Sequence, residues 1–278
     1  MDEMMWHGPS SASGLTGHVL GCWGFDVGQR RRLLLPDGTV KVMFALSGSI
    51  QVVDGVDGGE MAAGGSIGAG LGGRALVAQH SERLRGITVQ LTPLAAYRLS
   101  GVPMREWAHR AIPLSELFGP WADRFLNRLV DAPSWERRFD VLDQALTRRF
   151  HNGPPVHPEI VWAHEQILAR RGCVRVDQLA AEIGYSKRHL ERLFATEVGL
   201  PPRALAQIVR VQHALTLQRT SGSFASASVA AGFHDQAHFI RAFKAIAGFS
   251  PSAFVAMCQR AKGLDFFRPG LSGTLLVA

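Results

Sequence analysis

The sequence has few cysteines and no long apolar run, and each of these shortages excludes a class of protein. Its 278 residues contain three cysteines, Cys22, Cys173 and Cys258, which lie far apart and are odd in number. They supply neither a disulfide framework nor a paired-cysteine metal knuckle, so a reducing cytoplasm is the expected compartment. No run approaches the roughly 18 apolar residues of a membrane-spanning helix, and no membrane partner is expected. Residues 1–9 lack a basic segment followed by an apolar one, which argues against a secretory signal.

Positive charge is confined to one region of the chain, whose formal net charge is +7. Residues 157–262 contain 13 Lys and Arg against 7 Asp and Glu, whereas residues 1–156 contain 16 against 15. An excess of cations in one region is typical of a surface that binds phosphates. The alternative, that basic composition only keeps the protein in solution, predicts a more even spread.

The length allows two domains, and the apolar pattern differs between the parts of the chain. Residues 20–92 alternate short apolar runs with Asp-Gly and Ser-Gly turns, which is typical of a small β sandwich or barrel. From Pro93 the apolar spacing becomes helical. The fold class expected is therefore α+β with two domains: a β-rich N-terminal domain with accompanying helices, and an all-α C-terminal domain. Strands are predicted at 32–35, 40–46, 50–53, 74–78 and 86–91, and helices at 93–99, 121–130 and 134–150.

The predicted helix 134–150 carries an apolar stripe behind a possible N-cap, Ser134. Burial within its own domain and a subunit interface both explain such a stripe. Its members at helical spacing are Trp135, Phe139, Leu142 and Leu146.

A cluster of helix breakers at 151–155, His-Asn-Gly-Pro-Pro, marks the best domain boundary. We therefore predict a regulatory domain over 1–150, a linker over 151–157 and a helical domain over 158–260. Residues 261–278 form a tail without a usable pattern.

The helical domain contains an internal repeat. Gly184 recurs 48 residues later as Gly232, so the second turn holds one extra residue. In-register agreement at several informative positions indicates duplication of one small unit. The residues that recur 49 positions later are His189, Arg192, Phe194, Gly199 and Pro202.

Each copy has the layout of a helix-turn-helix unit. In the first copy, helix 176–183 is followed by a tight corner at Gly184 and by a second helix, about 186–196, that Ser186 caps. The second copy places its second helix at about 235–245. The apolar backs of these helices are Leu190, Leu193 and Phe194 in the first copy and Phe239 and Phe243 in the second.

The opposite faces of the two helices are polar and mostly basic, as a helix that enters the major groove requires. They carry Lys187, Arg188, Glu191 and Arg192 in the first copy and Gln236, Ala237, Ile240, Arg241 and Lys244 in the second. These nine residues are the predicted DNA-binding residues.

Arg192 and Arg241 are the strongest candidates for base recognition, because a guanidinium can donate two parallel hydrogen bonds to guanine. A phosphate contact or an internal salt bridge is the alternative for each. Gln236 fits adenine, and Ile240 can offer apolar contact to a thymine methyl group. Glu191 could accept from cytosine or merely balance Arg188.

His189 and His238 occupy equivalent places and are expected to pack or to contact phosphate, not to bind metal. Between the copies, helix 202–218 would be about 25 Å long at about 1.5 Å per residue. Such a rod can hold two recognition helices about one DNA turn, about 34 Å, apart. One chain could then read two successive major grooves.

Through the motifs at 184–194, 210–215 and 231–251, residues 158–257 resemble the AraC/XylS family of transcription regulators. The resemblance implies a seven-helix domain with two helix-turn-helix units, joined to an effector-sensing or dimerisation domain. It implies double-stranded promoter or operator DNA, a small-molecule effector and RNA polymerase as partners, with a homodimer possible. One departure is Ala227-Ser228, where the family usually has Ile-Ala, so the second unit is expected to pack more loosely.

The N-terminal region resembles cupin-like sensor domains less specifically, at 35–38, 42–44, 86–93 and 101–103. Trp23, Phe25, Phe44 and His80 are the candidates for an effector pocket, with core packing as the alternative for the aromatic residues. The rival function is a ligand-binding or enzymatic cupin protein with a non-binding helical domain. His80 is the only histidine in residues 20–92, so the metal-binding cluster of such an enzyme is missing.

No enzymatic activity, cofactor or metal is expected from the remaining motifs. The GxGxxG pattern at 68–73 lacks the strand and helix that a dinucleotide site needs around it. His164-Glu165 begins an HExxH pattern that Leu168 leaves incomplete. His234 and His238 have ligand spacing but no third ligand nearby.

Overall fold

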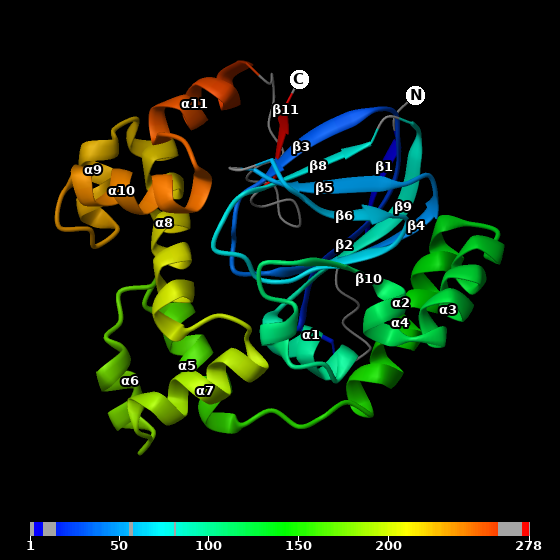
Figure 1. The fold of residues 1–278 in the computed structure, drawn as a ribbon, viewed down its shortest axis with the longest axis horizontal. Coiled ribbons are helices and arrows are strands. Elements are labelled where there is room, and N and C mark those ends of the chain that lie inside the picture. The colour runs from blue at the N-terminus through cyan, green and yellow to red at the C-terminus, as the bar shows by residue number, and fades with distance from the viewer. Residues whose placement is uncertain (1–2, 8–14, 56–57, 81, 261–273, 278) are drawn as a thin grey trace.

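The N-terminal part of the computed structural model is a sandwich of two antiparallel sheets (Figure 1). The structure describes residues 3–7, 15–55, 58–80, 82–260 and 274–277. The first sheet has the order β1 (Glu3–His7), β2 (Val19–Val27), β9 (Leu84–Leu91), β4 (Val40–Ser47), β7 (Ile67–Ala69) and β10 (Ala111–Pro113). The second has the order β11 (Thr274–Val277), β3 (Arg30–Leu34), β8 (Leu76–His80), β5 (Ile50–Asp54) and β6 (Glu60–Gly64).

Both faces of the first sheet are buried. Along β4, Met43 and Ala45 belong to the cluster between the sheets, whereas Val42 and Phe44 belong to the cluster that the helices cover. The ring of Phe44 meets the edge of Phe125 on the helical side, at 5.3 Å between centroids. Since successive side chains of a strand point to opposite faces, the apolar run of β4 serves both layers.

The helices that cover the first sheet are α1 (Pro93–Ser100), α2 (Leu114–Phe118), α3 (Pro120–Asp131) and α4 (Trp135–His151). Ser134 caps α4, accepting a hydrogen bond from the backbone N–H of Arg137 at 3.3 Å. The four stripe residues of α4 are all buried in the main core cluster, with Leu142 only 1% exposed. The stripe is therefore part of the core of this chain, and the subunit-interface interpretation of it is wrong.

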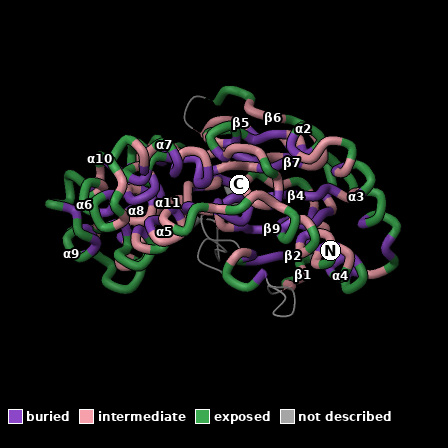
Figure 2. Tube along the Cα trace, turned by 90° about the horizontal axis from the view of Figure 1, so that it is seen from below, coloured by how far each residue is buried: buried purple, intermediate pink, exposed green. Residues whose placement is uncertain are grey.

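Residues 158–260 form seven helices, as the resemblance implied. They are α5 (Pro158–Ala169), α6 (Val176–Glu182), α7 (Lys187–Glu197), α8 (Pro202–Ser221), α9 (Phe224–Ala230), α10 (Gln236–Ala247) and α11 (Pro251–Arg260). In Figure 2, α6, α9 and α10 lie at the end of the molecule opposite α3 and α4. None of the helices in the described ranges is long and apolar enough to cross a membrane.

The helical part rests against the sandwich through a few specific contacts. The Gln212 side chain on α8 donates to the carbonyl of Pro36, at 2.6 Å. The backbone N–H of Ala75 donates to the carbonyl of Ile246 on α10, at 2.8 Å. Arg105 of the 3-10 helix η1 (Met104–Glu106) donates to the Thr196 hydroxyl on α7, at 2.9 Å. The N-terminal part thus contacts the linker helix and both helix-turn-helix units.

The linker between α4 and α5 is held where it enters the helical part. The backbone N–H of His157 donates to a carboxylate oxygen of Glu197, at 3.1 Å, and the imidazole pairs with the other oxygen. Glu197 is buried at the end of α7. This contact ties the start of α5 to the end of a recognition helix.

Several strands were not among the predictions. The apolar run of β2 is buried along most of its length, so it lacks the alternation that marks a half-exposed strand. β11 lies in the tail, for which no pattern was recognised, and pairs with β3. The GxGxxG segment falls on β7 and the loop after it, without a following helix, in agreement with its interpretation as a turn region.

Candidate nucleic-acid interface

The two predicted helix-turn-helix units are present and share their local geometry. α6 and α7 meet at Gly184, with φ of +70°, and α9 and α10 meet at Gly232, with φ of +81°. Both corners lie in the left-handed region, which glycine adopts without the steric cost of a side chain. The duplication seen in the sequence is therefore a duplication of backbone conformation.

The first recognition helix, α7, is capped and divided into two faces as predicted. Ser186 accepts a hydrogen bond from the backbone N–H of His189, at 3.2 Å. Leu190 and Phe194 are fully buried and Leu193 nearly so, which anchors the helix on its domain. The outward residues Lys187, Arg188 and Arg192 are exposed, and Glu191 is half-buried.

The second recognition helix, α10, repeats the arrangement with a stronger cap. Asp235 accepts from the backbone N–H of His238 at 2.6 Å, and this hydrogen bond lowers the pKa of the Asp235 carboxyl. Phe239 and Phe243 are fully buried. Ile240 is half-buried, so only part of its side chain faces outward. The four other outward residues predicted on this helix, Gln236, Ala237, Arg241 and Lys244, are exposed.

His189 and His238 make equivalent ring contacts in the two units. The His189 ring meets the edge of Tyr185 at 4.5 Å and 84°, and the His238 ring meets Phe233 at 5.3 Å and 86°. These contacts fit the packing role expected for the histidines. No group of three or more His, Cys, Asp or Glu able to hold a metal occurs among the residues that the structure describes.

Two of the outward cations on α7 already have neighbours. Lys187 pairs with Asp177 at 3.3 Å, but both side chains are more than half exposed, so the pair is weak and easily exchanged for a phosphate. A guanidinium nitrogen of Arg192 lies 3.3 Å from Nδ1 of His189, which steadies the arginine without neutralising it. Arg188, Arg241 and Lys244 have no ion pair within the described part of the chain.

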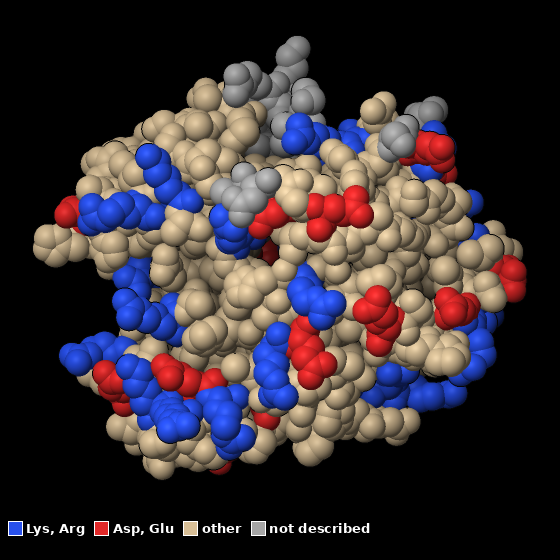
Figure 3. Space-filling model, viewed as in Figure 1, with Lys and Arg blue, Asp and Glu red and all other residues tan. Residues whose placement is uncertain are grey.

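The two helices present their cations on one side of the molecule. Figure 1 shows both with their N-terminal ends towards the left edge, joined by α8. Lys and Arg side chains gather along that edge over both units and between them (Figure 3). α8 has 20 residues and is therefore about 30 Å long, close to one turn of DNA.

The comparisons with known proteins agree on the class of this domain. Residues 179–257 match a helix-turn-helix domain family. Over 103 residues the chain is 31% identical to PqrA of Proteus vulgaris, a probable transcription factor. The matched stretch is 36% of this chain and 81% of PqrA. The chain belongs to the AraC/XylS family of transcription regulators.

Two other known proteins match over a shorter or a more divergent stretch. The regulator MtrA of Neisseria gonorrhoeae is 34% identical over 80 residues, which is 28% of this chain and only 27% of MtrA. The crystal structure of ToxT from Vibrio cholerae aligns with 82% of this chain and 96% of ToxT, at 12% identity and a TM-score of 0.43.

At the family's usual Ile-Ala positions, Ala227 and Ser228 are both buried in this chain. The hydroxyl of Ser228 donates to the carbonyl of Ala225, at 3.0 Å, so the buried polar atom is satisfied within its own helix. Looser packing of the second unit remains a prediction.

The four effector candidates are all buried, but they lie in different parts of the N-terminal core. Trp23 and Phe25 lie in the cluster between the sheets, and Phe44 lies on the helical side of the first sheet. His80 lies on β8, where Nδ1 is 2.7 Å from the carbonyl of Glu82. Its Nε2 is buried without a hydrogen-bond partner among the described residues. His80 is thus the one candidate with an unsatisfied polar atom.

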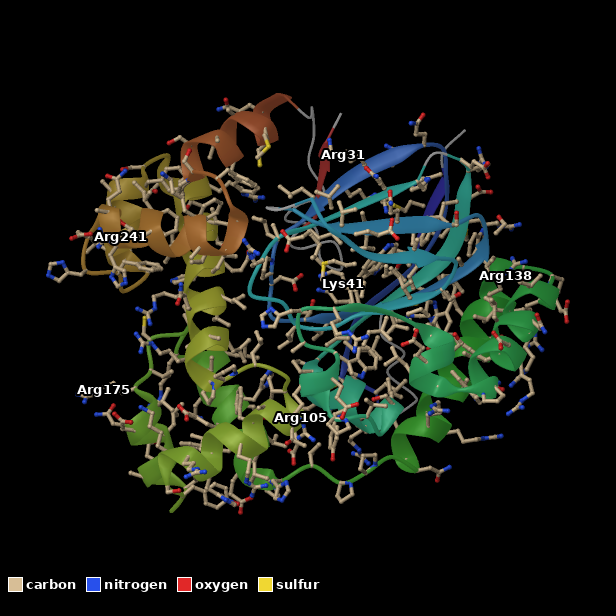
Figure 4. The ribbon with its side chains drawn as sticks, viewed as in Figure 1. Arg31, Lys41, Arg105, Arg138, Arg175 and Arg241 are labelled. Atoms are coloured by element: carbon tan, nitrogen blue, oxygen red, sulfur yellow. The ribbon has the colours of Figure 1, made fainter. Side chains whose placement is uncertain are left out.

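All nine residues predicted from the sequence to bind DNA lie on the recognition helices. The cations between these helices were not among them. Arg175 extends from the left edge of the molecule in Figure 4, on the same side as Arg241. Its position depends on how the loop after α5 packs, which no helical periodicity reveals.

Proposed function

We propose that this chain regulates transcription by binding specific DNA through residues 158–260, under the control of residues 1–150. The observation that carries the proposal is the pair of capped, exposed recognition helices whose N-terminal ends lie on one face, joined by α8. That arrangement matches the entry of two helices into successive major grooves. The nine outward residues of α7 and α10 are proposed as the DNA contacts, with Arg192 and Arg241 as base readers.

The test is DNA binding by the full chain, first to select a specific site from genomic fragments and then to compare variants on it. Arg192→Ala and Arg241→Ala should each lose about 1–3 kcal/mol on the selected site and almost nothing on random DNA. Arg137→Ala removes the same charge from an exposed position on α4 and serves as the control. Equal losses on selected and random DNA would make the two arginines phosphate contacts.

In this proposal the N-terminal sandwich binds a small-molecule effector or forms a homodimer. RNA polymerase is the further partner. The unsatisfied Nε2 of His80, in the buried interior, supports a polar contact to a small molecule there. A compound screen that reads DNA affinity of the full chain tests this. A compound that changes the affinity of the wild type should lose its effect on His80→Phe, which retains basal DNA binding.

A further inference from the structure

The segment that joins α5 to α6, residues 170–175, lies beside α8 between the two helix-turn-helix units (Figure 1). Its Gly172 approaches α8 so closely that a Cβ there would lie 2.1 Å from the carbonyl oxygen of Ala206. Arg210 of α8 donates to the Gly172 carbonyl, at 3.2 Å. Cys173 contacts the carbonyl of Ala231, at the corner of the second unit, at 3.5 Å. The segment is thus fixed against both the linker helix and the second unit.

Arg171 occupies a backbone position that normally belongs to glycine. The backbone N–H of Gly172 donates to the carbonyl of Ile167, and that of Arg171 donates to Leu168. These two bonds make a Schellman motif in which Arg171 is the first left-handed residue after the helix, with φ of +52°, and Gly172 follows it with φ of +76°. A residue with a Cβ is strained there, so conformation alone would favour glycine. A strained residue at such a place points to a use for its side chain.

The side chains of the segment present uncompensated positive charge. Arg171 is exposed, and its guanidinium donates to Nε2 of His213, at 3.1 Å, which orients it without cancelling its charge. Arg175 is exposed and has no ion-pair partner in the described ranges. Arg170 differs, because it pairs with Glu182 at 3.3 Å. In Figure 4, Arg175 projects from the same edge of the molecule as Arg241.

We propose that Arg171 and Arg175 bind phosphates of the DNA backbone in the stretch between the two recognition helices. A protein that places two helices in successive major grooves must cross the minor groove between them, where the two backbones flank its surface. The segment 170–175 lies at that place and offers two exposed guanidinium groups, which match phosphate geometry. This inference rests on the DNA binding proposed above.

Arg171→Gly separates binding from folding. The change removes the strain at φ of +52°, so the variant should unfold at the same or a higher denaturant concentration than the wild type. On DNA it should bind about fivefold more weakly at 0.15 M salt, on selected and random sequences alike. The slope of log affinity against log salt should fall by about 0.9 for the lost phosphate contact. Arg175→Ala should show the same loss, and the double variant should lose both.

Arg137→Ala is the matched control, because it removes one arginine from the opposite end of the molecule and should leave the salt slope unchanged. An Arg171→Gly or Arg175→Ala protein with the affinity and slope of the wild type would overturn the phosphate contacts. So would a loss confined to the selected site, since phosphates carry no sequence. Failure of the wild type itself to bind DNA would instead contradict the proposed function.

Discussion

The buried His164 of α5 gives the stability of the helical domain a dependence on pH. The residue is 4% exposed, its Nε2 has no partner among the described residues, and burial lowers its pKa to about 4. Unfolding returns the imidazole to water, where its pKa is about 6.5. On acidification the unfolded chain therefore takes up this proton at a higher pH than the folded chain does. The contribution of His164 to the free energy of unfolding is complete above about pH 6.5 and is lost as the pH falls towards 4.

We predict that acidification from pH 7 to pH 5 lowers the free energy of unfolding by about 2 kcal/mol through this residue. Urea unfolding at the two pH values measures the difference. His164→Leu should remove that part of the pH dependence, because the new side chain does not titrate. His234→Leu, which changes a histidine with an 88% exposed side chain, should keep it. A wild type and a His164→Leu variant with the same pH dependence would contradict the assignment.

Residue types alone indicated the two faces of the recognition helices but not the environment of His164. The outward and inward sets follow from helical spacing, and the burial of Leu190 and Phe194 confirms the inward set. His164 showed only an incomplete metal pattern, since one sequence does not reveal which residues of α5, α7 and α8 surround it. Arg171 was not among the predicted binding residues for a similar reason. The feature that distinguishes it is its left-handed backbone conformation, which its residue type does not reveal.

At the scale of elements, α4 is a core helix, and a charge on its buried stripe should unfold the N-terminal domain. Leu142 is 1% exposed, so Leu142→Glu would bury an unpaired carboxylate or expose the core. We expect a loss of at least about 3 kcal/mol, from the missing apolar contacts and the uncompensated charge together. Thermal unfolding and the yield of folded protein measure it.

Gln144→Glu is the control for Leu142→Glu, because Gln144 is an exposed position on the same helix. That variant should unfold within about 0.5 kcal/mol of the wild type. A Leu142→Glu protein as stable as the wild type would contradict the core role of the stripe.

The helices that were given bounds were predicted to within a few residues, whereas α2 (Leu114–Phe118) was not predicted and strands were recovered unevenly. α1, α7 and α10 carry capping residues and a regular apolar period, which together mark both ends and faces. β2 is apolar on both faces because helices cover one side of its sheet and the second sheet covers the other. β7 and β10 have three residues each, too few to show any period. Sheet order and register depend on long-range pairing that a local pattern does not encode.

At the scale of the whole molecule, the docking of the helical part on the sandwich had no sequence signal. Two of its hydrogen bonds end on main-chain carbonyls, those of Pro36 and Ile246, whose residue identity is irrelevant to the bond. Apolar contact adds to them, since Leu205 of α8 lies within reach of a Cβ at Gly38. Through these contacts a change in the sandwich would reach α7, α8 and α10 together.

The contacts predict that the two parts of the chain unfold as one unit. Arg105 and Gln212 supply two side-chain hydrogen bonds across the boundary, and each such bond contributes about 0.5–1.5 kcal/mol. Figure 4 shows Arg105 where η1 approaches the helical part. In the wild type, tryptophan emission and circular dichroism at 222 nm should follow one denaturant transition. Five of the six tryptophans lie in residues 1–150, so emission reports mainly on the N-terminal part.

The double variant Arg105→Ala, Gln212→Ala should separate the two transitions, since the helical part loses about 1–3 kcal/mol of support from the sandwich. Gln218→Ala, on the same helix as Gln212 but without a side-chain bond to the sandwich in the described structure, should leave them coincident. Coincident transitions in the double variant would mean that apolar contact around Leu205 carries the coupling. In that case Leu205→Ala, which opens a cavity at a fully buried position, should separate them instead, because the boundary would then lose its packing and keep its hydrogen bonds.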